Sequence, residues 1–251
     1  MKKIILMLLL MASFIFAKET ITIGIGEWAP FNGEKLPHYG MSSHITTDVF
    51  ALEGINVKYE FMPWKRVIVL TERAECDGTI EWTKTQKKLK QFYFAEKPLL
   101  ISKVVVFHRK NYDFDFEKYE DLFKERIGLT RGYAYGNKID EFLMDGKSKV
   151  ANTDEVNLRN LLLNRIDLFF CDLLVGRKLL NEKFSKEEKE KIIYSEIPIE
   201  ESNLYFIVSK KHPRAKEIIN KFDLGMNKII KSGRYQQYYD DLVEGKYDEV
   251  K

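Results

Sequence analysis

The first part of the chain alternates between strand patterns and helix patterns, and this alternation points to the α/β class of folds. Residues 20–26 and 55–61 alternate polar with apolar side chains and are rich in β-branched residues, which predicts strands. Residues 42–53 and the stretch that begins at Trp64 carry apolar residues at helical spacing. Residues 76–80 are short and partly apolar, as in a buried strand. Strands linked by helices in this way are expected to pair in parallel, with right-handed crossovers.

The second half of the chain repeats this order. Further strands are predicted at residues 101–107, 126–130, 149–152, 167–171 and 204–209. Helices are predicted at 119–123, 137–144, 153–163, 173–181, 213–232 and 234–244, with a charged, solvated segment at 186–191. Extended crossovers near 105–112 and 200–206 would then join two lobes, which predicts a hinged clamp with a cleft between the sheet ends.

We therefore expect an α/β protein of two lobes, each a mostly parallel sheet flanked by helices, joined by a two-strand hinge. Lobe 1 is predicted to comprise residues 18–108 plus 206–251, and lobe 2 residues 109–205. In open α/β sheets, ligands bind outside the carboxyl ends of the strands. The polar and aromatic loop at 81–88 follows one such strand, so this loop is the first candidate for a ligand-binding segment.

Residues 1–17 have the pattern of a secretory signal peptide. Lys2 and Lys3 precede an apolar run at 4–16, and the small residue Ala17 stands at the expected cleavage point. A run of about 13 residues is too short to cross a hydrocarbon core about 30 Å thick, although an uncleaved anchor is the alternative. No later segment is apolar enough to span a membrane. We expect cleavage near Ala17 and a soluble, exported protein.

Charge and cysteine content argue against several classes of protein. The formal net charge is +3, and the basic residues are interspersed with acidic ones, so no nucleic-acid partner is expected. Cys76 and Cys171 lie in apolar strand patterns and are interpreted as buried free thiols, although export also permits a disulfide. The histidines show no ligand spacing, so neither a metal nor another cofactor is expected.

Several short motifs, each loose alone, resemble a known family when their order and spacing are taken together. They are Pro63-Trp64, Cys76-Asp77-Gly78, Thr85-Gln86-Lys87-Lys88, FAEKP at 94–98, RIGLTRG at 126–132, NRID at 164–167 with Asp172, and SGRY at 232–235. Over its whole mature length the chain resembles the periplasmic solute-binding proteins of family 3, the polar amino acid type that serves ABC importers. The resemblance implies a two-lobed periplasmic-binding-protein-like fold, a periplasmic location, and a monomer that binds a small polar solute. It also implies the membrane permease of an ABC transporter as a partner.

The resemblance carries binding positions with it, and the chain departs from some of them. Amino-acid binders of the family have a Thr-Pro-Glu-Arg pattern whose arginine pairs with the ligand carboxylate, and here the matching position is Lys88. Lysine keeps the charge but lacks the planar fork that matches a carboxylate. At the start of the lobe-two helix, the segment 132–134 lacks the family's hydroxyls but keeps backbone N–H groups. Asp172 matches the aspartate that takes the ligand's ammonium. An ordinary α-amino acid is therefore not the expected ligand.

These positions lead to a hypothesis for the site. Arg131 and Lys88 would hold an anionic group of the ligand, while Asp172 or Glu81 would hold a cationic one. Aromatic walls and the loop after the third strand complete the set, and the predicted ligand-binding residues are Trp28, Glu81, Trp82, Thr83, Lys88, Arg131, Tyr133 and Asp172. Lys88 could equally be a solvated lysine, and Trp64 is interpreted as a core residue or as a support behind the ligand contacts.

The predicted function is that of an exported receptor which captures an amino-acid-like solute and delivers it to an ABC importer. An enzyme is the alternative, because the family resembled here includes secreted cyclohexadienyl dehydratases, and Glu81 or Asp172 could then act as the acid. A soluble sensory binding protein is a further alternative. We find no nucleophilic triad and no phosphate-binding motif, so we expect a binding protein and not an enzyme.

Overall fold

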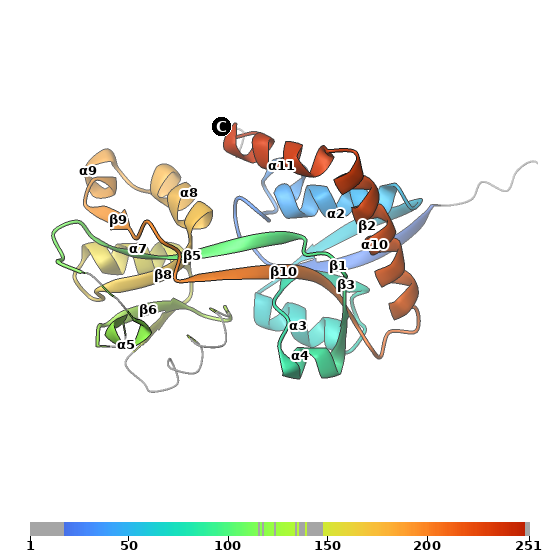
Figure 1. Cartoon of the computed structure of the whole chain (residues 1–251), viewed down its shortest axis with the longest axis horizontal. Helices are drawn as coiled ribbons and strands as arrows, with labels where there is room; N and C mark the ends of the chain where they lie inside the picture. The colour runs from blue at the N-terminus through green and yellow to red at the C-terminus, as the bar shows by residue number, and fades with distance from the viewer. Residues whose placement is uncertain are drawn as a thin grey trace, which may run out of the picture.

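A computed structural model of the chain describes residues 18–248, apart from 115, 117, 123, 134, 136–138 and 140–147. Figure 1 shows two lobes side by side along the long axis, with the two longest strands running between them. The predicted signal peptide, the predicted helix at 137–144 except residue 139, and residue 134 lie outside the described residues. Within the described part, no helix is both long and apolar enough to cross a membrane.

Lobe 1 is built on three parallel strands. Strands β1 (Glu19–Ile25), β2 (Ile55–Phe61) and β3 (Gly78–Trp82) lie in the order β2-β1-β3. Their parallel pairing follows from the helices between them, α2 (Met41–Ala51) and α3 (Trp64–Glu72), as the alternating sequence pattern predicts. The short 3-10 helix η1 (Pro37–Tyr39) precedes α2. The carboxyl ends of β1 and β3 therefore lie next to each other at one edge of the sheet.

Two long antiparallel strands connect the lobes. Strand β5 (Leu100–Arg109) and strand β10 (Glu200–Ser209) pair with each other over residues 100–104 and 200–204. Beyond this shared part, β10 continues into lobe 1 against β3, and β5 continues into lobe 2 against β8. The hinge is thus a continuous piece of sheet, which keeps its backbone hydrogen bonds satisfied while it crosses between the lobes. The predicted lobe boundaries at 108 and 206 stay a prediction, and they fall within these two strands.

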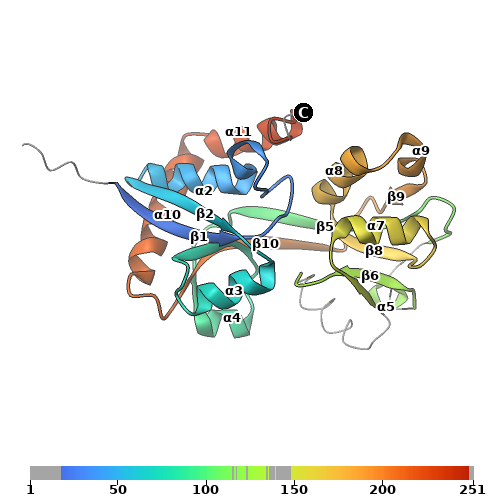
Figure 2. The same cartoon turned by 180° about the vertical axis from the view of Figure 1, so that it is seen from behind.

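Lobe 2 is also built on three parallel strands flanked by helices. Its parallel strands are β6 (Ile127–Thr130), β7 (Lys149–Ala151) and β8 (Leu168–Asp172), in the order β8-β6-β7. Helices α7 (Asp154–Leu162) and α8 (Leu173–Lys183) lie on one side of this sheet and α5 (Tyr119–Leu122) on the other (Figure 2). The remaining elements of this lobe are α9 (Lys186–Lys189) and β9 (Ile192–Tyr194).

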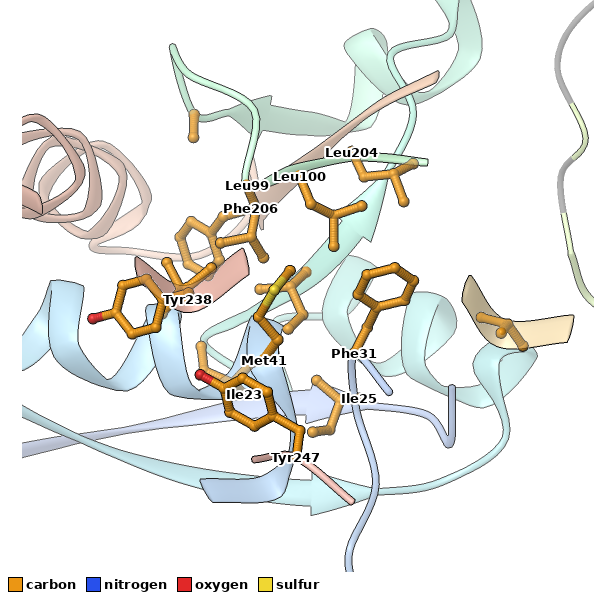
Figure 3. Packing of buried hydrophobic residues seen from close by; sticks show 14 of the residues in the cluster. Ile23, Ile25, Phe31, Met41, Leu99, Leu100, Leu204, Phe206, Tyr238 and Tyr247 are labelled. Atoms are coloured by element: carbon orange, nitrogen blue, oxygen red, sulfur yellow. The ribbon is translucent and has the colours of Figure 1, made fainter. Parts of the chain in front are cut away.

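The two helices at the end of the chain return to lobe 1. Helix α10 (Ala215–Lys231) is strongly amphipathic, and it buries Ile218, Phe222 and Ile229 on one face. Helix α11 (Arg234–Val243) follows it. Figure 3 shows the core that they help to cover, in which side chains from β1, α2, β10 and α11 meet. Because both ends of the chain pack into this core, lobe 1 is assembled from segments far apart in sequence.

Most predicted elements are found within two residues of their expected bounds, but strand β10 begins at Glu200, four residues before the predicted start at 204. The other differences concern short elements. Strand β3 is displaced two residues toward the C-terminus relative to the prediction of 76–80. Helix α4 (Gln86–Gln91) and strand β4 (Phe92–Phe94) replace part of what was expected to be loop. Cys76 and Cys171 are both buried and free, as interpreted from the sequence.

Candidate functional site

A pocket lies where the lobes and the hinge strands meet. It encloses about 730 Å³ of space, part of which is open to solvent. Its lining comes from three sources: Trp28, Trp64, Glu81, Trp82, Thr83 and Lys88 of lobe 1, Ser102, Val104, Ser202 and Leu204 of the hinge strands, and Gly132, Tyr133, Tyr135 and Asp172 of lobe 2. Each hinge strand contributes residues two apart, because alternate side chains point to the same face of a strand. A pocket built in this way would change shape with any movement of one lobe relative to the other.

The backbone of β3 is irregular where it meets the pocket. Trp82 pairs with Tyr205 of β10 and Thr79 pairs with Ile207, so the register shifts between these two pairs. Glu81 lies within the shift and has a φ of 71°, a conformation that costs a residue other than glycine about 1–3 kcal/mol. Such bulges redirect side chains next to functional sites. The irregularity thereby places the Glu81 carboxyl in the pocket lining.

Glu81 is held from one side only. Oε2 accepts a hydrogen bond from Asn32 Nδ2, and Asn32 is itself fixed by the Ser43 hydroxyl at 3.0 Å. Oε1 is buried and has no hydrogen-bond partner among the described residues. The Ser42 hydroxyl lies near the carboxyl and favours its ionised form, but does not meet the geometry of a hydrogen bond with it. Burial outweighs these contacts and, with the charge of Asp172, raises the pKa of Glu81 to about 8.

Aromatic rings form the walls of the pocket, and all three tryptophans of the chain line it. Trp64 packs edge-to-face on Trp82, with ring centroids 5.9 Å apart. Trp82 is also fixed by its indole N–H, which donates to Thr79 Oγ1 at 3.0 Å. The ring centroids of Trp28 and Tyr133 of lobe 2 are 6.5 Å apart, so the aromatic wall continues across the cleft. The buried Trp28 Nε1 has no partner in the described part of the chain.

Lys88 lies on the same side of the pocket, in the first turn of α4. Thr85 caps this helix by accepting a hydrogen bond from the Lys88 amide. The Lys88 ammonium donates to Thr83 Oγ1 at 3.2 Å and lies 5.3 Å from the ring centroid of Trp82. The capped helix thus directs the lysine at the pocket, although a loop was predicted at this position.

Asp172 faces the pocket from lobe 2 and ends strand β8. It is the N-cap of α8, where Oδ1 accepts hydrogen bonds from the amides of Leu174 and Val175 at 2.9 and 3.3 Å. Oδ2 accepts from Ser102 Oγ at 2.8 Å and from the amide of Lys103 at 3.1 Å. The carboxyl therefore ties α8 to hinge strand β5. Burial raises its pKa in spite of these four donors.

A third buried carboxyl lies behind the aromatic wall. Asp154 accepts hydrogen bonds from the Thr130 hydroxyl and, at 3.0 Å, from the hydroxyl of Tyr133. Burial raises the pKa of Asp154 to about 6. The contact fixes Tyr133, because a ring held at its hydroxyl cannot turn away from the pocket without losing this hydrogen bond to Asp154 Oδ2. Asp154 is thus a supporting group for Tyr133.

The structure brings together seven of the eight residues predicted to bind ligand. Arg131 is the exception: its side chain is exposed, and Nε donates to Asn152 Oδ1 at 3.1 Å. Sequence reasoning placed Trp64 in the core or behind the ligand contacts, yet it lines the pocket. It also did not find the hinge residues Ser102 and Ser202. Their alternation along a strand was visible, but nothing local indicated which face would meet the other lobe.

The chain can now be compared with known protein families and with curated proteins. The family model of bacterial extracellular solute-binding proteins, family 3, matches residues 21–244. The chain belongs to this family. A search of curated proteins found no match.

Solved structures share the fold of this family 3 protein at low sequence identity. A histidine kinase sensor domain with similarity to periplasmic binding proteins superposes with a TM-score of 0.75 at 17% identity, over 89% of this chain and 96% of the other. The amino acid ABC transporter substrate-binding protein AbpA from Streptococcus pneumoniae, bound to L-arginine, gives 0.75 at 15% identity, over 93% and 98%. An ancestral amino-acid-binding protein, a precursor of cyclohexadienyl dehydratase, gives 0.70 at 16% identity, over 90% and 96%. At these identities the likeness establishes the two-lobed fold.

Proposed function

We propose that this family 3 protein is a receptor that captures a small polar solute between its lobes. The observation that carries the proposal is the pocket lined jointly by lobe 1, the hinge strands and lobe 2. A solute that contacts all three surfaces binds better to the closed form than to the open form, and this difference in affinity is what closes the lobes. The fold of the arginine-bound AbpA supports an amino-acid-like solute.

We propose that the captured solute is then transported into the cell. The signal-peptide pattern at 1–17 supports export to the periplasm, and family membership supports delivery of the solute to the permease of an ABC importer. The eight predicted residues remain the proposed contacts of the solute, including Arg131, which lies outside the lining.

The test is a screen of amino acids, polyamines, opines and small organic acids by thermal shift and by intrinsic fluorescence. Every tryptophan of the chain lines the pocket, so a bound solute should change the emission directly. A solute at 100 times its Kd stabilises the folded state by about 2.7 kcal/mol, which corresponds to a rise in Tm of about 5–10 °C.

Variants of α4 show whether a solute that gives such a shift occupies this pocket. Lys88→Ala removes the ammonium from the lining and should weaken the response about tenfold or more. The matched control is Lys87→Ala, one residue earlier on the same helix, where the side chain is exposed and outside the lining. An equal response in the Lys88→Ala variant and the wild type would contradict the proposed site.

An enzyme is the second candidate, and one observation favours it. Glu81 carries a carboxyl whose pKa of about 8 keeps it protonated at neutral pH, as a general acid in the pocket requires. The fold is shared with the precursor of cyclohexadienyl dehydratase. Incubation of the purified protein with prephenate distinguishes the two candidates, because an aromatic product lost in the Glu81→Gln variant would identify an enzyme.

A further inference from the structure

Two carboxyls face the pocket from opposite lobes, and they differ in how many hydrogen bonds they already accept. Asp172 accepts four, two on each oxygen. An ionised carboxylate offers about four lone-pair sites. Asp172 is therefore saturated by α8 and β5, and a ligand could bind it only by displacing one of these donors. Its position is explained by its structural role as an N-cap and a hinge contact.

Glu81 is in the opposite situation. Asn32 donates to Oε2, and the described residues provide no hydrogen bond to the buried Oε1. Even a rotated Ser42 hydroxyl would leave lone-pair sites on Oε1 open. A buried carboxyl oxygen without a donor is costly, and the bulge of β3 that holds it there adds backbone strain at a φ of 71°. These features are accounted for if a donor arrives with the ligand.

We propose that Glu81, and not Asp172, receives the cationic group of the ligand, and that this group is an ammonium or guanidinium with N–H donors. The inference rests on the proposed function and specifies its ligand class. The ligand-free Glu81 is protonated at neutral pH, but the charge of a cationic ligand would favour its ionised form, whose partnerless Oε1 then accepts an N–H donor. The positive charge follows from the two facing carboxyls and from the indole faces of Trp64 and Trp82, which attract cations.

The other end of the ligand is also indicated. Trp28 Nε1 is a buried donor without a partner in the described part of the chain, and it lies in the same lining. Lys88 directs a second donor at the pocket from α4. An acceptor group, such as a carboxylate, carbonyl or hydroxyl, would match these donors. The ligand is thus a small molecule with an N–H cation at the Glu81 end and an acceptor at the other.

The test uses a defined panel with the full-length mature protein. Arginine, lysine, agmatine and putrescine carry N–H cations, choline and glycine betaine carry cations without N–H, and succinate and glucose carry no cation. Affinities are measured by tryptophan fluorescence for the wild type, Glu81→Gln and Asp172→Asn. Both substitutions keep the side-chain shape, and asparagine remains a good N-cap. Glu60→Gln on strand β2 controls for the same change of charge outside the pocket.

We expect at least one N–H cation to bind. Glu81→Gln should lower the affinity for this cation roughly 30-fold or more, because it removes a buried charge partner. Asp172→Asn should weaken it less, and Glu60→Gln should match the wild type. Tight binding of succinate, glucose or betaine that Glu81→Gln leaves unchanged would overturn the inference but support the proposed function. A larger loss in Asp172→Asn than in Glu81→Gln would also overturn it. No response from any member of the panel would count against both.

Discussion

At the scale of single residues, Glu81 combines strain, burial and an incomplete set of hydrogen bonds. The groups that face it are Asn32, Ser42 and Asp172, and Lys88 is the cation in the same lining. None of the described neighbours forms an ion pair with it at hydrogen-bond distance. The ligand-free protein therefore keeps a carboxyl that would be more stable elsewhere, which is typical of functional sites.

This arrangement predicts a pH-dependent stability difference between the wild type and Glu81→Gln. The pKa of Glu81 is raised from 4.5 to about 8 in the folded state, so between these values the folded state holds a proton that the unfolded state has lost. Wild-type stability then falls as the pH rises through this window, and the glutamine variant lacks this loss. We expect the Tm of the Glu81→Gln variant to exceed that of the wild type by about 3 °C or more at pH 8, with little difference between the two proteins at pH 4.

Thermal unfolding of both proteins across this pH range, without added ligand, checks the expectation. Glu60→Gln is the control, because it removes the same charge from a side chain that is 42% exposed and outside the pocket lining. A constant difference in Tm between the wild type and Glu81→Gln at all pH values would mean that Glu81 titrates normally.

The residue types predicted where the candidate site lies, but they did not predict which way each side chain points. Trp28, Trp82 and Asp172 were predictable because they follow strands, where an α/β fold places its ligands. Trp64 was not, because an indole in the first turn of an amphipathic helix fits a core pattern equally well. Arg131 follows strand β6 in the same manner, yet its side chain contacts Asn152 outside the lining. The direction of a side chain in a loop depends on tertiary neighbours that sequence spacing does not reveal.

At the scale of elements, segments with a clear period were predictable, and two of the shortest strands were not. Strand β2 spans residues 55–61, as its alternation indicates. Strands β4 and β9 have three residues each, which is too short for a period to be recognised. The displacement of β3 has a specific cause: its last residues, Glu81 and Trp82, are polar or bulky and look like loop, but the pairing with β10 continues through a bulge.

The contact between β1 and α3 sets one wall of the pocket, and this leads to a prediction. A Cβ atom on Gly26, just after β1, would lie 2.5 Å from the indole of Trp64. Gly26→Ala must therefore displace this indole, at a cost of about 1–3 kcal/mol in the free energy of unfolding. Because Trp64 lines the pocket, we expect ligand affinity to fall about tenfold as well.

Gly24→Ala is the matched control, two residues earlier on the same strand. Its Cβ would meet Cys76 Sγ at 3.2 Å, a much milder contact that lies away from the pocket. Fluorescence titration and denaturant unfolding of both variants separate the two effects. Unchanged ligand affinity in Gly26→Ala would show that the position of Trp64 does not shape the site.

At the scale of the whole molecule, the lobes touch in at least two separate places. Across the aromatic wall, Trp28 meets Tyr133, and a Cβ on Gly132 would lie 3.9 Å from Lys65 N. A separate contact is made by the segment after α11. Tyr247 is buried in lobe 1 and shares a hydrogen bond with His44 Nδ1 at 2.9 Å. The next residue, Asp248, reaches Lys178 of α8 in lobe 2 at 2.6 Å. Figure 1 shows the C-terminal end of α11 on the side of lobe 1 that faces α8.

The ion pair between Lys178 and Asp248 is expected to favour the arrangement of the lobes seen in this structure over a more open one. The Lys178 side chain is only 7% exposed, and it also pairs with Glu182 on its own helix at 2.7 Å. In Lys178→Met the apolar stem is kept but the tie between lobes is lost, so the open form should gain in population. We expect ligand affinity to fall about three- to tenfold, as a coupling of about 1 kcal/mol implies. Small-angle X-ray scattering should show a larger radius of gyration for the ligand-free variant.

Lys246→Met provides the control, because Lys246 pairs with Asp241 at 2.6 Å and Glu244 at 3.1 Å within lobe 1 and does not cross to lobe 2. Removing it takes one positive charge from the same segment without breaking a contact between lobes, so its scattering and ligand affinity should match the wild type. If both lysine variants kept the wild-type radius and affinity, the terminal segment would be a local feature of lobe 1. If only Lys178→Met changed them, closure would depend on a contact that lies outside the pocket, and the strength of ligand binding would be set partly by residues that never touch the ligand.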